Sequence, residues 1–556
     1  MKRFYKITAL ALSLLMCLAL AACGPSTDTP PDSTASADPN GESAQTADDP
    51  KVITLTESWD FSLGIVPVLN PGNSSNYGAI YWGRNFYNTL VSYNAQGELV
   101  GELAERWEIS EDGKSYTFYL RDGVKFSDGS PLTAEAVKLS YEAAVVNLGE
   151  YNGSFGLLSS LFGDIEVVDE GTLIVHLTNP YYGALNDMTM CCPLGIVNPV
   201  VFEGQDDLTY GDIFKTASFG TGPYLYEGDY EDNTYTFVRN PHYWGEAPDV
   251  DVFRVKVIED NDSKLLALRS GEIDAVLGSN RISFDGYAEL SADPSFHGGM
   301  HERSSLTRLL SMNVTNPPFN DVLVRQALAY TIDQSMLETA VFNGLETVAD
   351  TMFPRTAPYC DVEQTIYETD LDKAKSLLEQ AGWTDSDDDG IREKDGVPFE
   401  VDLNYQTSLS SIDNLALAVA ARLLEVGIKV NVVPGDMMTF YAAMATTPLA
   451  IANTYGGAFE PTTLVTNMNP RVSTDPISMQ FAAYFEEGIL DELESTADDA
   501  RVQEIYNHIL TTIADESLLV PLTRAHELGI WNSEKIADYG FYVDSNYVVV
   551  SNIHLK

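Results

Sequence analysis

Positive charge is scarce in this sequence. There are 32 lysine and arginine residues against 82 aspartate and glutamate residues, so the formal net charge is −50 at pH 7. Proteins that bind nucleic acid do so through basic faces, and docking along anionic lipid also needs basic residues. The composition therefore argues against both partners, and we expect the carboxylates to form a solvated acidic surface.

Cysteine is scarce as well, with five in 556 residues. Cys17 and Cys23 lie in or directly behind an apolar N-terminal segment. The remaining three, Cys191, Cys192 and Cys360, are an odd number and imply no disulfide framework.

The common motifs of enzymes are missing too. The sequence has no Gly-x-Ser-x-Gly, His-Glu-x-x-His, Cys-x-x-Cys or Ser-x-x-Lys pattern. Gly220-Thr221-Gly222 lacks the third glycine of a dinucleotide-binding loop. A hydrolase assembled from distant residues stays an alternative, but we predict a protein without catalytic residues and without a cofactor.

Only one long apolar run is present. It covers residues 7–22, which is shorter than the roughly 20 residues that cross a bilayer as a helix. Lys2, Arg3 and Lys6 precede it, and small residues end it. This order is typical of a secretory signal, so we predict a signal peptide over residues 1–22 and an extracytoplasmic location.

The end of that signal, Leu20-Ala21-Ala22-Cys23, resembles the bacterial lipobox, in which the cysteine is acylated. We therefore expect lipidation of Cys23 and attachment to the outer face of the cell membrane through its lipid. An ordinary signal peptide with an accidental cysteine is the alternative. Residues 23–50 lack aromatic residues and are rich in serine, threonine, proline and aspartate, which predicts a disordered tether.

Helix and strand patterns mix along the remaining chain of about 500 residues, which is long enough for more than one core. Periodicity and end signals predict strands over 52–55, 116–120, 173–177 and 428–432. They predict one helix that begins after Thr133 and three more helices over 370–382, 415–426 and 500–515. The mixture indicates an α/β protein of more than one domain.

Five stretches in order resemble the family 5 solute-binding proteins of ABC importers, the peptide and nickel class. The resemblance extends from about Val52 almost to the C-terminus. It is carried by residues 87–141 (with LVSYNAQGELVGELAERW), 220–245 (GTGPY and VRNPHYWG), 267–276 (ALRSGEIDAV), 312–333 (MNVTNPPFNDVLVRQALAYTID) and 370–383 (DLDKAKSLLEQAGW).

The resemblance implies a two-lobed periplasmic-binding-protein-like fold of the class II type, with a hinge and an extra subdomain in the N-terminal lobe. It places lobe 1 with its subdomain at 51–305, lobe 2 at 306–524, and a return to lobe 1 at 525–556. It also implies a monomer whose partners are a small-molecule or peptide ligand and the permease and ATPase subunits of an ABC importer.

The resemblance further implies ligand-binding residues in TYGGAFEPT, residues 454–462. Nickel members have a Trp-Gly-x-x-Tyr-Asp-Pro-His pattern there, whereas this chain has Tyr455, Phe459, Glu460 and Thr462 at the aromatic, acidic and histidine positions. Glu460 would bind the amino group of a peptide, or it would only cap a turn. Tyr455 and the glycines would let a ligand approach closely, and the ligand-binding residues predicted here are Tyr455, Gly456, Gly457 and Glu460.

In lobe 1 the resemblance places Tyr77, Tyr81 and Cys192 at the cleft. Nickel members tend to carry arginines where this chain has Cys192 and Gly195. Without these arginines and the histidine, nickel and an arginine-bound carboxylate ligand are less favoured. Core packing is the alternative role for the two tyrosines.

Three segments contain residues that could ligate a metal. Asp385, Asp387 and Asp389 match the first half of a calcium loop, but Gly396 stands where the bidentate glutamate belongs, so a polar hairpin turn is the alternative. Met190, Cys191 and Cys192 suit soft metals, or fill a core. The pair formed by His297 and His301 is separated by two glycines, which do not favour a helix.

We therefore predict an extracytoplasmic, lipid-anchored receptor that binds a short peptide or peptide-like solute between two lobes and delivers it to an ABC permease. The first alternative is a receptor for nickel or a metal chelate in the same importer class. A secreted hydrolase and a sensor receptor that reports its ligand are less favoured.

Overall fold

The structure is a computed structural model that describes residues 49–68, 77–153, 156–278, 281–407, 411–454, 461–472, 478–544 and 547–556. Residues Pro50–Lys556 form one compact unit, separate from Met1–Asp49. The predicted signal, Cys23 and nearly all of the predicted tether thus lie outside the described residues. In the described part of the chain, no helix is both long enough and apolar enough to cross a membrane.

The first sheet has the strand order β1-β10-β9-β8. These strands are β1 Val52–Glu57, β10 Val252–Val257, β9 Thr234–Arg239 and β8 Tyr224–Glu231. Strand β1 pairs with β10 in parallel, and the other pairs are antiparallel. The core beside this sheet is rich in aromatic rings: Trp82 and Phe237 both stack on Phe253, with centroids 5.9 and 4.7 Å away. Aromatic side chains bury a large area each and so contribute strongly to this core.

A second sheet has the order β4-β5-β7-β6 and a hydrophobic core of its own. Its strands are β4 Ala104–Ile109, β5 Ser115–Leu120, β7 Thr172–Leu177 and β6 Phe162–Asp169. Helix α2, Ala134–Leu148, packs against β6 and β7. This sheet and its core form the extra subdomain of the N-terminal lobe, and we call the first and second sheets together lobe 1.

The third sheet has the order β11-β19-β12-β18-β16-β17, with β13 paired to β19. Its strands are β11 Ala275–Leu277, β19 Leu519–Asn532, β12 Phe296–Met312, β18 Leu449–Asn453, β16 Glu400–Gln406, β17 Lys429–Gly435 and β13 Glu346–Val348. Helices α8 Val322–Thr331, α10 Leu371–Gln380, α11 Ile412–Leu424 and α15 Asp499–Asp515 share one hydrophobic core with its β16, β17 and β18 side, and we call this part lobe 2.

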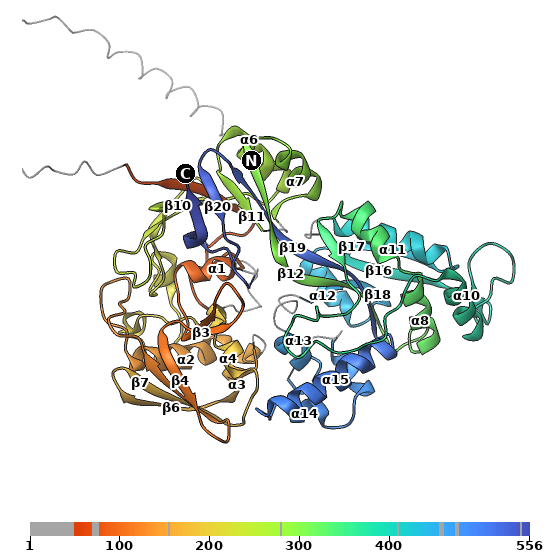
Figure 1. Cartoon of the computed structure of the whole chain (residues 1–556), viewed down its shortest axis with the longest axis horizontal. Helices are drawn as coiled ribbons and strands as arrows, with labels where there is room; N and C mark the ends of the chain where they lie inside the picture. The colour runs from red at the N-terminus through yellow and green to blue at the C-terminus, as the bar shows by residue number, and fades with distance from the viewer. Residues whose placement is uncertain are drawn as a thin grey trace, which may run out of the picture. The chain divides into compact units, whose positions relative to one another are not determined.

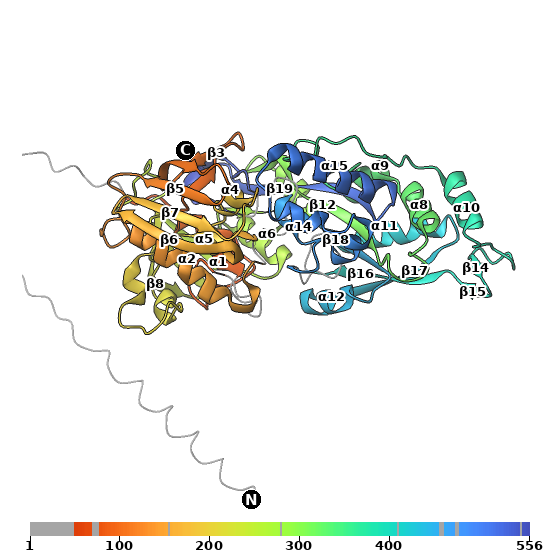
Figure 2. The ribbon, with the colours of Figure 1, turned by 90° about the horizontal axis from the view of Figure 1, so that it is seen from below.

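Two long antiparallel strands connect the lobes. Strand β12 pairs with β19 from Phe296 opposite Asn532 to Ser311 opposite Leu519. One end of the pair lies beside β11 and lobe 1, and the other end lies between β18 and β13 in lobe 2 (Figure 1). Figure 2 shows the same division from below, with β14 and β15 at the far end of lobe 2. The two-lobed α/β fold predicted from the sequence is present.

Further helices and strands complete the two lobes. The helices are α1 Tyr77–Trp82, α3 Leu158–Leu161, α4 Ala184–Asp187, α5 Cys191–Leu194, α6 Asn261–Ser270, α7 Phe284–Ser291, α9 Gln334–Met336, α12 Met437–Met444, α13 Thr462–Thr466 and α14 Ile489–Leu493. The strands are β2 Val91–Tyr93, β3 Leu99–Gly101, β14 Glu393–Lys394, β15 Val397–Pro398, β20 Ile536–Tyr539 and β21 Ile553–Leu555.

The helix ends follow from local side-chain chemistry. The Thr133 hydroxyl accepts a hydrogen bond from the Ala136 N–H and starts α2, as the sequence predicted. The Asp370 carboxylate accepts from the Lys373 N–H and starts α10. Such caps satisfy N–H groups that have no partner inside a helix, so they fix where each helix begins.

Candidate ligand-binding site

The ligand-binding segment predicted in lobe 2 is only partly described. Tyr455, Gly456, Gly457 and Glu460 lie outside the described residues, and their roles stay predictions. Thr454, directly before them, is fully buried beside β12. Its N–H donates to the Thr307 carbonyl at 3.0 Å, and its hydroxyl accepts from the Thr307 N–H at 2.8 Å. The segment therefore begins at a point fixed to a strand that connects the lobes.

The segment ends where lobe 2 approaches lobe 1. Thr462, at the start of α13, is 2% exposed. A Cβ on Gly183 of lobe 1 would lie 2.5 Å from the Thr462 Cγ2, which is closer than real contacts allow. Glycine at position 183 is therefore required for this approach.

The tyrosines predicted for lobe 1 lie on the short helix α1. The side chain of Tyr77 is not among the described ones. Tyr81 is partly buried, and the Arg281 guanidinium lies over its ring, 4.8 Å from the centroid. The Tyr81 carbonyl accepts from the Val548 N–H, so the returning C-terminal segment holds this helix. A cation over the ring stabilises Tyr81 by a cation–π interaction, and ligand contact by either tyrosine stays a prediction.

A buried ionic network that no sequence motif indicates lies beside Tyr81. Glu57, the last residue of β1, is 0% exposed and pairs with Arg281 at 2.8 Å. The Trp82 Nε1–H donates to the same carboxylate at 2.9 Å, and the Ser58 N–H donates at 2.6 Å. Burial by itself raises the pKa of Glu57, but the charge of Arg281 and these hydrogen bonds outweigh it and hold the pKa below its usual range. Glu57 therefore stays ionised, and its bonds to Trp82 and Arg281 fix α1 and Arg281 relative to the end of β1.

Lys264 extends this network. Its side chain is fully buried, and Nζ donates to the Ser58 hydroxyl at 2.6 Å and to Asn261 Oδ1 at 2.9 Å. Burial lowers the pKa of Lys264 to about 8, although the charge of Glu57 opposes the shift. Such a buried lysine can indicate a functional site, but the partners of Lys264 found in the described structure belong to the network around Glu57.

Another buried cation, Arg84, interacts with Cys191, the neighbour of the predicted cleft residue Cys192. The Arg84 guanidinium donates to the Thr189 carbonyl at 2.6 Å and pairs with Glu102 at 3.4 Å. It also lies over the rings of Tyr542 and Tyr547, 4.7 and 5.4 Å from their centroids. These contacts hold the backbone that leads into Cys191 and Cys192, so the segment has a rigid support.

Lobe 2 has a buried ion pair next to Thr307. The Arg308 guanidinium contacts Glu346 of β13 at 2.6 and 2.7 Å, and both side chains are almost completely buried, 2% and 0% exposed. Thr523 of β19 donates its hydroxyl to the same carboxylate. Three neighbouring strands are thereby joined by charge-assisted hydrogen bonds.

Comparison with known proteins identifies the class to which this two-lobed architecture belongs. Residues 98–474, more than half of the chain, match the family described as Bacterial extracellular solute-binding proteins, family 5 Middle. The chain belongs to this family. Its relatives are binding proteins, so this family 5 protein is an extracytoplasmic solute-binding protein and not an enzyme.

Two curated relatives of this family 5 protein come from Escherichia coli (strain K12). A nickel-binding periplasmic protein is 29% identical over 476 residues, which cover 84% of this chain and 88% of that protein. A dipeptide-binding protein is 29% identical over 313 residues, which cover 53% of this chain and 57% of that protein. Among solved structures, NikA from Brucella suis in complex with Fe(III)-EDTA has a TM-score of 0.82 and 27% identity, with 91% of this chain and 100% of that chain covered.

The neighbouring cysteines Cys191 and Cys192 of the family 5 protein are both buried. Cys191 is 1% exposed, and its thiol contacts the Tyr87 carbonyl at 3.6 Å. Burial raises the pKa of Cys191 above that of an exposed thiol. Cys191 is therefore a core residue. Cys192 is also buried, at 7% exposed, and its predicted contact with a ligand stays untested.

Among the described residues, one acidic group has the spacing of a cation site. Ligand oxygens of Asp385, Asp387, Asp389 and Glu393 all lie within 4.8 Å of one another. Glu393 was not predicted, and it comes from β14 of the small hairpin that follows the loop. The hairpin agrees with the alternative of a polar turn, and exposed acidic groups are common without an ion. Calcium binding stays a prediction.

The predicted histidine pair lies on a strand. His297 and His301 are both in β12, His297 packs on the Trp531 ring, and the His301 Nδ1 lies 3.0 Å from the Arg303 carbonyl. Their side chains therefore have partners other than a shared metal.

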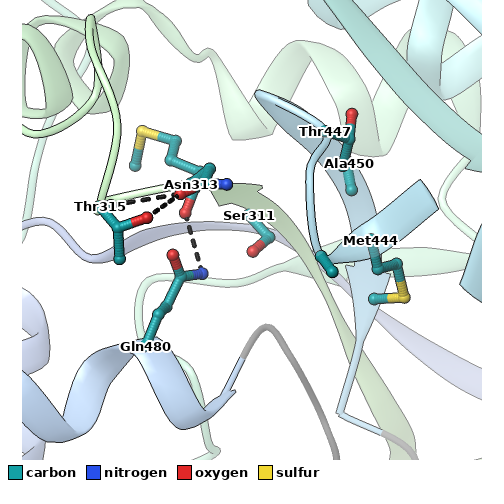
Figure 3. A pocket seen from close by; sticks show the side chains of 9 residues that line it. Ser311, Asn313, Thr315, Met444, Thr447, Ala450 and Gln480 are labelled. Atoms are coloured by element: carbon teal, nitrogen blue, oxygen red, sulfur yellow. Dashed lines mark hydrogen bonds between the residues drawn. The ribbon is translucent and has the colours of Figure 1, made fainter. Parts of the chain in front are cut away.

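A small cavity at the far end of β12 is lined by both polar and apolar side chains (Figure 3). Its volume is about 110 Å³, and Ser311, Asn313, Thr447 and Gln480 line it. Gln480 is held at both ends of its amide, by the Met312 carbonyl at 3.1 Å and by the Val314 N–H at 2.9 Å. Solute sites usually measure roughly 300–1,000 Å³, so this cavity is too small for a peptide.

Proposed function

We propose that this family 5 protein is a lipid-anchored receptor that binds a short peptide or peptide-like solute between its two lobes and delivers it to an ABC permease. The mechanism is binding and hinge closure without chemistry on the solute. The tether would keep the receptor at a high local concentration beside its membrane partner.

The observation that carries the choice of a peptide is the chemistry of residues 454–462. The segment has an acidic residue, Glu460, and has Thr462 where nickel members show a histidine. In the part of the chain that the structure describes, three or more histidine, cysteine or acidic side chains converge only at Asp385–Glu393, and that group contains no histidine or cysteine. A transition metal prefers such nitrogen and sulfur ligands, which supports a solute with an amino group over a directly bound metal ion.

A metal chelate is the second candidate. The E. coli nickel-binding protein matches a longer part of this chain than the dipeptide-binding protein does, and the similar NikA structure contains Fe(III)-EDTA. A chelate carries its own metal ligands, so it would need few from the protein.

The proposed hinge is the β12–β19 pair. The register between these strands shifts between Met300 and Ser304, between Ser304 and Leu306, and between Arg308 and Leu309. Such bulges bend and twist a strand locally, so they are suitable places for rotation. They support the proposed lobe boundaries at 305/306 and 524/525, which divide the chain into 51–305, 306–524 and 525–556.

Native mass spectrometry of residues 51–556 separates the two candidates. The protein is purified gently and then mixed with peptide pools or with Ni²⁺, Zn²⁺ or Cu⁺. We expect a peptide adduct and no stoichiometric metal adduct. A metal or metal-chelate adduct in place of a peptide would overturn the choice of solute but not the importer class.

Replacing Glu460 with glutamine should weaken binding of a solute with a free amine by about 1.5–3 kcal/mol, the usual contribution of a hydrogen bond to a charged group. Calorimetry with the captured peptide measures the change. The matched control is Glu487→Gln, since Glu487 is an exposed glutamate of lobe 2. An unchanged affinity in Glu460→Gln would reduce Glu460 to a turn residue.

Replacing Cys23 with alanine should abolish incorporation of a fatty-acid label and release the processed protein from the membrane, because lipidation needs this thiol. Labelling of cells with an alkyne fatty acid, followed by fractionation, measures both effects. Cys360→Ala is the control, since Cys360 is a buried residue of lobe 2 and should leave the label in place. Wild-type protein without label would disprove the lipid anchor.

A further inference from the structure

Three tyrosines meet where the two lobes touch. The Tyr182 and Tyr506 hydroxyls are 2.9 Å apart and form a hydrogen bond. The Tyr182 ring packs edge-on against both Tyr359 and Tyr506, with centroids 5.9 and 6.1 Å away. Tyr359 and Tyr506 also pack on each other, with centroids 5.2 Å apart. We call these three residues the tyrosine cluster.

The cluster joins parts of the chain that belong to different lobes. Tyr182 follows β7 and precedes α4 in lobe 1, whereas Tyr506 is on α15 of lobe 2 and Tyr359 lies in the segment before α10. Tyr182 packs against the core of the lobe 1 subdomain and against the core of lobe 2. In Figure 1, α4 and α15 face each other across the lobe boundary, away from the connecting strands β12 and β19. The cluster therefore lies on the far side of the boundary from the hinge.

Two close approaches of small residues surround the cluster. Gly183, next to Tyr182, leaves no room for a Cβ beside Thr462 of lobe 2. Gly113, in the turn between β4 and β5, would place a Cβ 2.9 Å from the Ala497 Cβ of lobe 2. Close packing at these points brings the backbones near enough for the tyrosine rings to meet.

Tyr359 has a backbone conformation that needs support. Its φ is +62°, in the left-handed region, which is an outlier for a bulky side chain. Its hydroxyl donates to Asp499 at 3.0 Å, and its carbonyl accepts from the Gln503 side chain at 3.0 Å. Both partners are on α15, so contacts within lobe 2 hold the Tyr359 ring in place without any contact from lobe 1.

We propose that the tyrosine cluster is a clasp that stabilises the closed arrangement of the lobes independently of the solute. A solute that binds only the closed form has its apparent affinity divided by the fraction of protein that is closed. The clasp therefore sets part of the affinity from a place outside the predicted ligand-binding residues. The proposal rests on the two-lobed fold and on the hinge, and it does not depend on which solute is bound.

The test measures the distance between the lobes in the full chain without solute. Nitroxide labels are placed on Val168→Cys in β6 and Glu487→Cys before α14, two exposed positions in lobes 1 and 2. Electron–electron double resonance then gives the distribution of label distances. Tyr182→Phe keeps the ring and removes one hydroxyl, so we expect the ratio of closed to open protein to fall roughly three- to tenfold, which corresponds to one hydrogen bond.

Further variants separate the clasp from a general loss of packing. Tyr506→Phe should have the same effect as Tyr182→Phe. The double variant should show no further effect, because each single substitution already removes the same hydrogen bond. Tyr367→Phe is the control: the Tyr367 hydroxyl donates to the Ala514 carbonyl of α15, inside lobe 2, at 3.1 Å. A distance distribution in both variants that is the same as in the wild type would overturn the proposal. Because no solute is present, failure of the peptide proposal cannot imitate this result.

Discussion

Replacing Arg308 with methionine is expected to lower the free energy of unfolding by about 3–5 kcal/mol, the usual cost of removing one partner of a buried ion pair. Glu346 is 0% exposed and would keep only the Thr523 hydroxyl, so its charge would stay in the core without a cation. Chemical denaturation monitored by tryptophan fluorescence measures the loss.

Arg106→Met is the matched control for that experiment. Arg106 pairs with Glu108 at 2.5 Å, but both side chains are more than half exposed. Water stabilises the remaining carboxylate there, so the expected loss is much smaller than that of Arg308→Met. Adding Glu346→Met to Arg308→Met should restore most of the stability, since no buried charge remains. A loss below about 1 kcal/mol in Arg308→Met alone would contradict the interpretation.

The position of this ion pair links stability to the proposed function. Arg308 follows Thr307, which fixes Thr454 at the start of the predicted ligand-binding segment. It also adjoins one of the β12–β19 register shifts, between Arg308 and Leu309. The pair therefore holds lobe 2 rigid at the place where the connecting strands enter it. In the proposed hinge motion, the pair would keep these strands of lobe 2 joined while one lobe rotates against the other.

Local elements of the fold could be predicted because their causes are local. The cap at Thr133 and the apolar spacing after Asp370 act within one turn of helix, so α2 and α10 were found from the sequence. Strand β7 alternates buried and partly exposed residues, which shows as a period of two. The family resemblance supplied the lobes themselves, which no local pattern encodes.

The contacts inside lobe 1 and between the lobes could not be predicted, because they join residues that are distant in the sequence. Glu57 and Arg281 are 224 positions apart, and Tyr182 and Tyr506 are 324 apart. Neither pair has a spacing or motif that distinguishes it from other residues of its type. For Tyr81, the sequence left core and cleft open, and the structure adds Arg281 as its partner. Glu393 completes the acidic group at Asp385 only because β14 returns beside the loop.

Replacing Asp187 with asparagine is expected to stabilise the protein more at pH 8 than at pH 4. The free energy of unfolding of the variant minus that of the wild type should be about 2–4 kcal/mol larger at pH 8. The Asp187 side chain is 1% exposed, and burial raises its pKa to about 7, although hydrogen bonds such as that from the Leu158 N–H at 3.0 Å oppose the shift. In the unfolded chain an aspartate has a pKa of about 3.9.

The sign follows from proton binding. Between pH 4 and 7 the folded protein binds more protons at Asp187 than the unfolded chain does, so the contribution of Asp187 to stability falls as the pH rises, and it becomes constant only once the pH is well above the folded-state pKa of about 7. Asparagine does not titrate but can still accept from the Leu158 N–H. The stability difference between variant and wild type should therefore grow between pH 4 and 7 and then level off.

Asp112→Asn gives the opposite sign in the same subdomain and so serves as the control. The Ser110 hydroxyl and the Lys114 N–H donate to the exposed Asp112 carboxylate and hold its pKa below the usual range. Asp112 therefore stabilises the folded protein once the pH is above the pKa of aspartate in the unfolded chain. Relative to the wild type, the asparagine variant should become less stable as the pH rises and this carboxyl ionises. Urea unfolding of both variants at half-unit pH steps measures the two curves. If the Asp187→Asn curve is flat between pH 4 and 7, the buried carboxyl ionises as it does in the unfolded chain, and burial at α4 does not set its protonation.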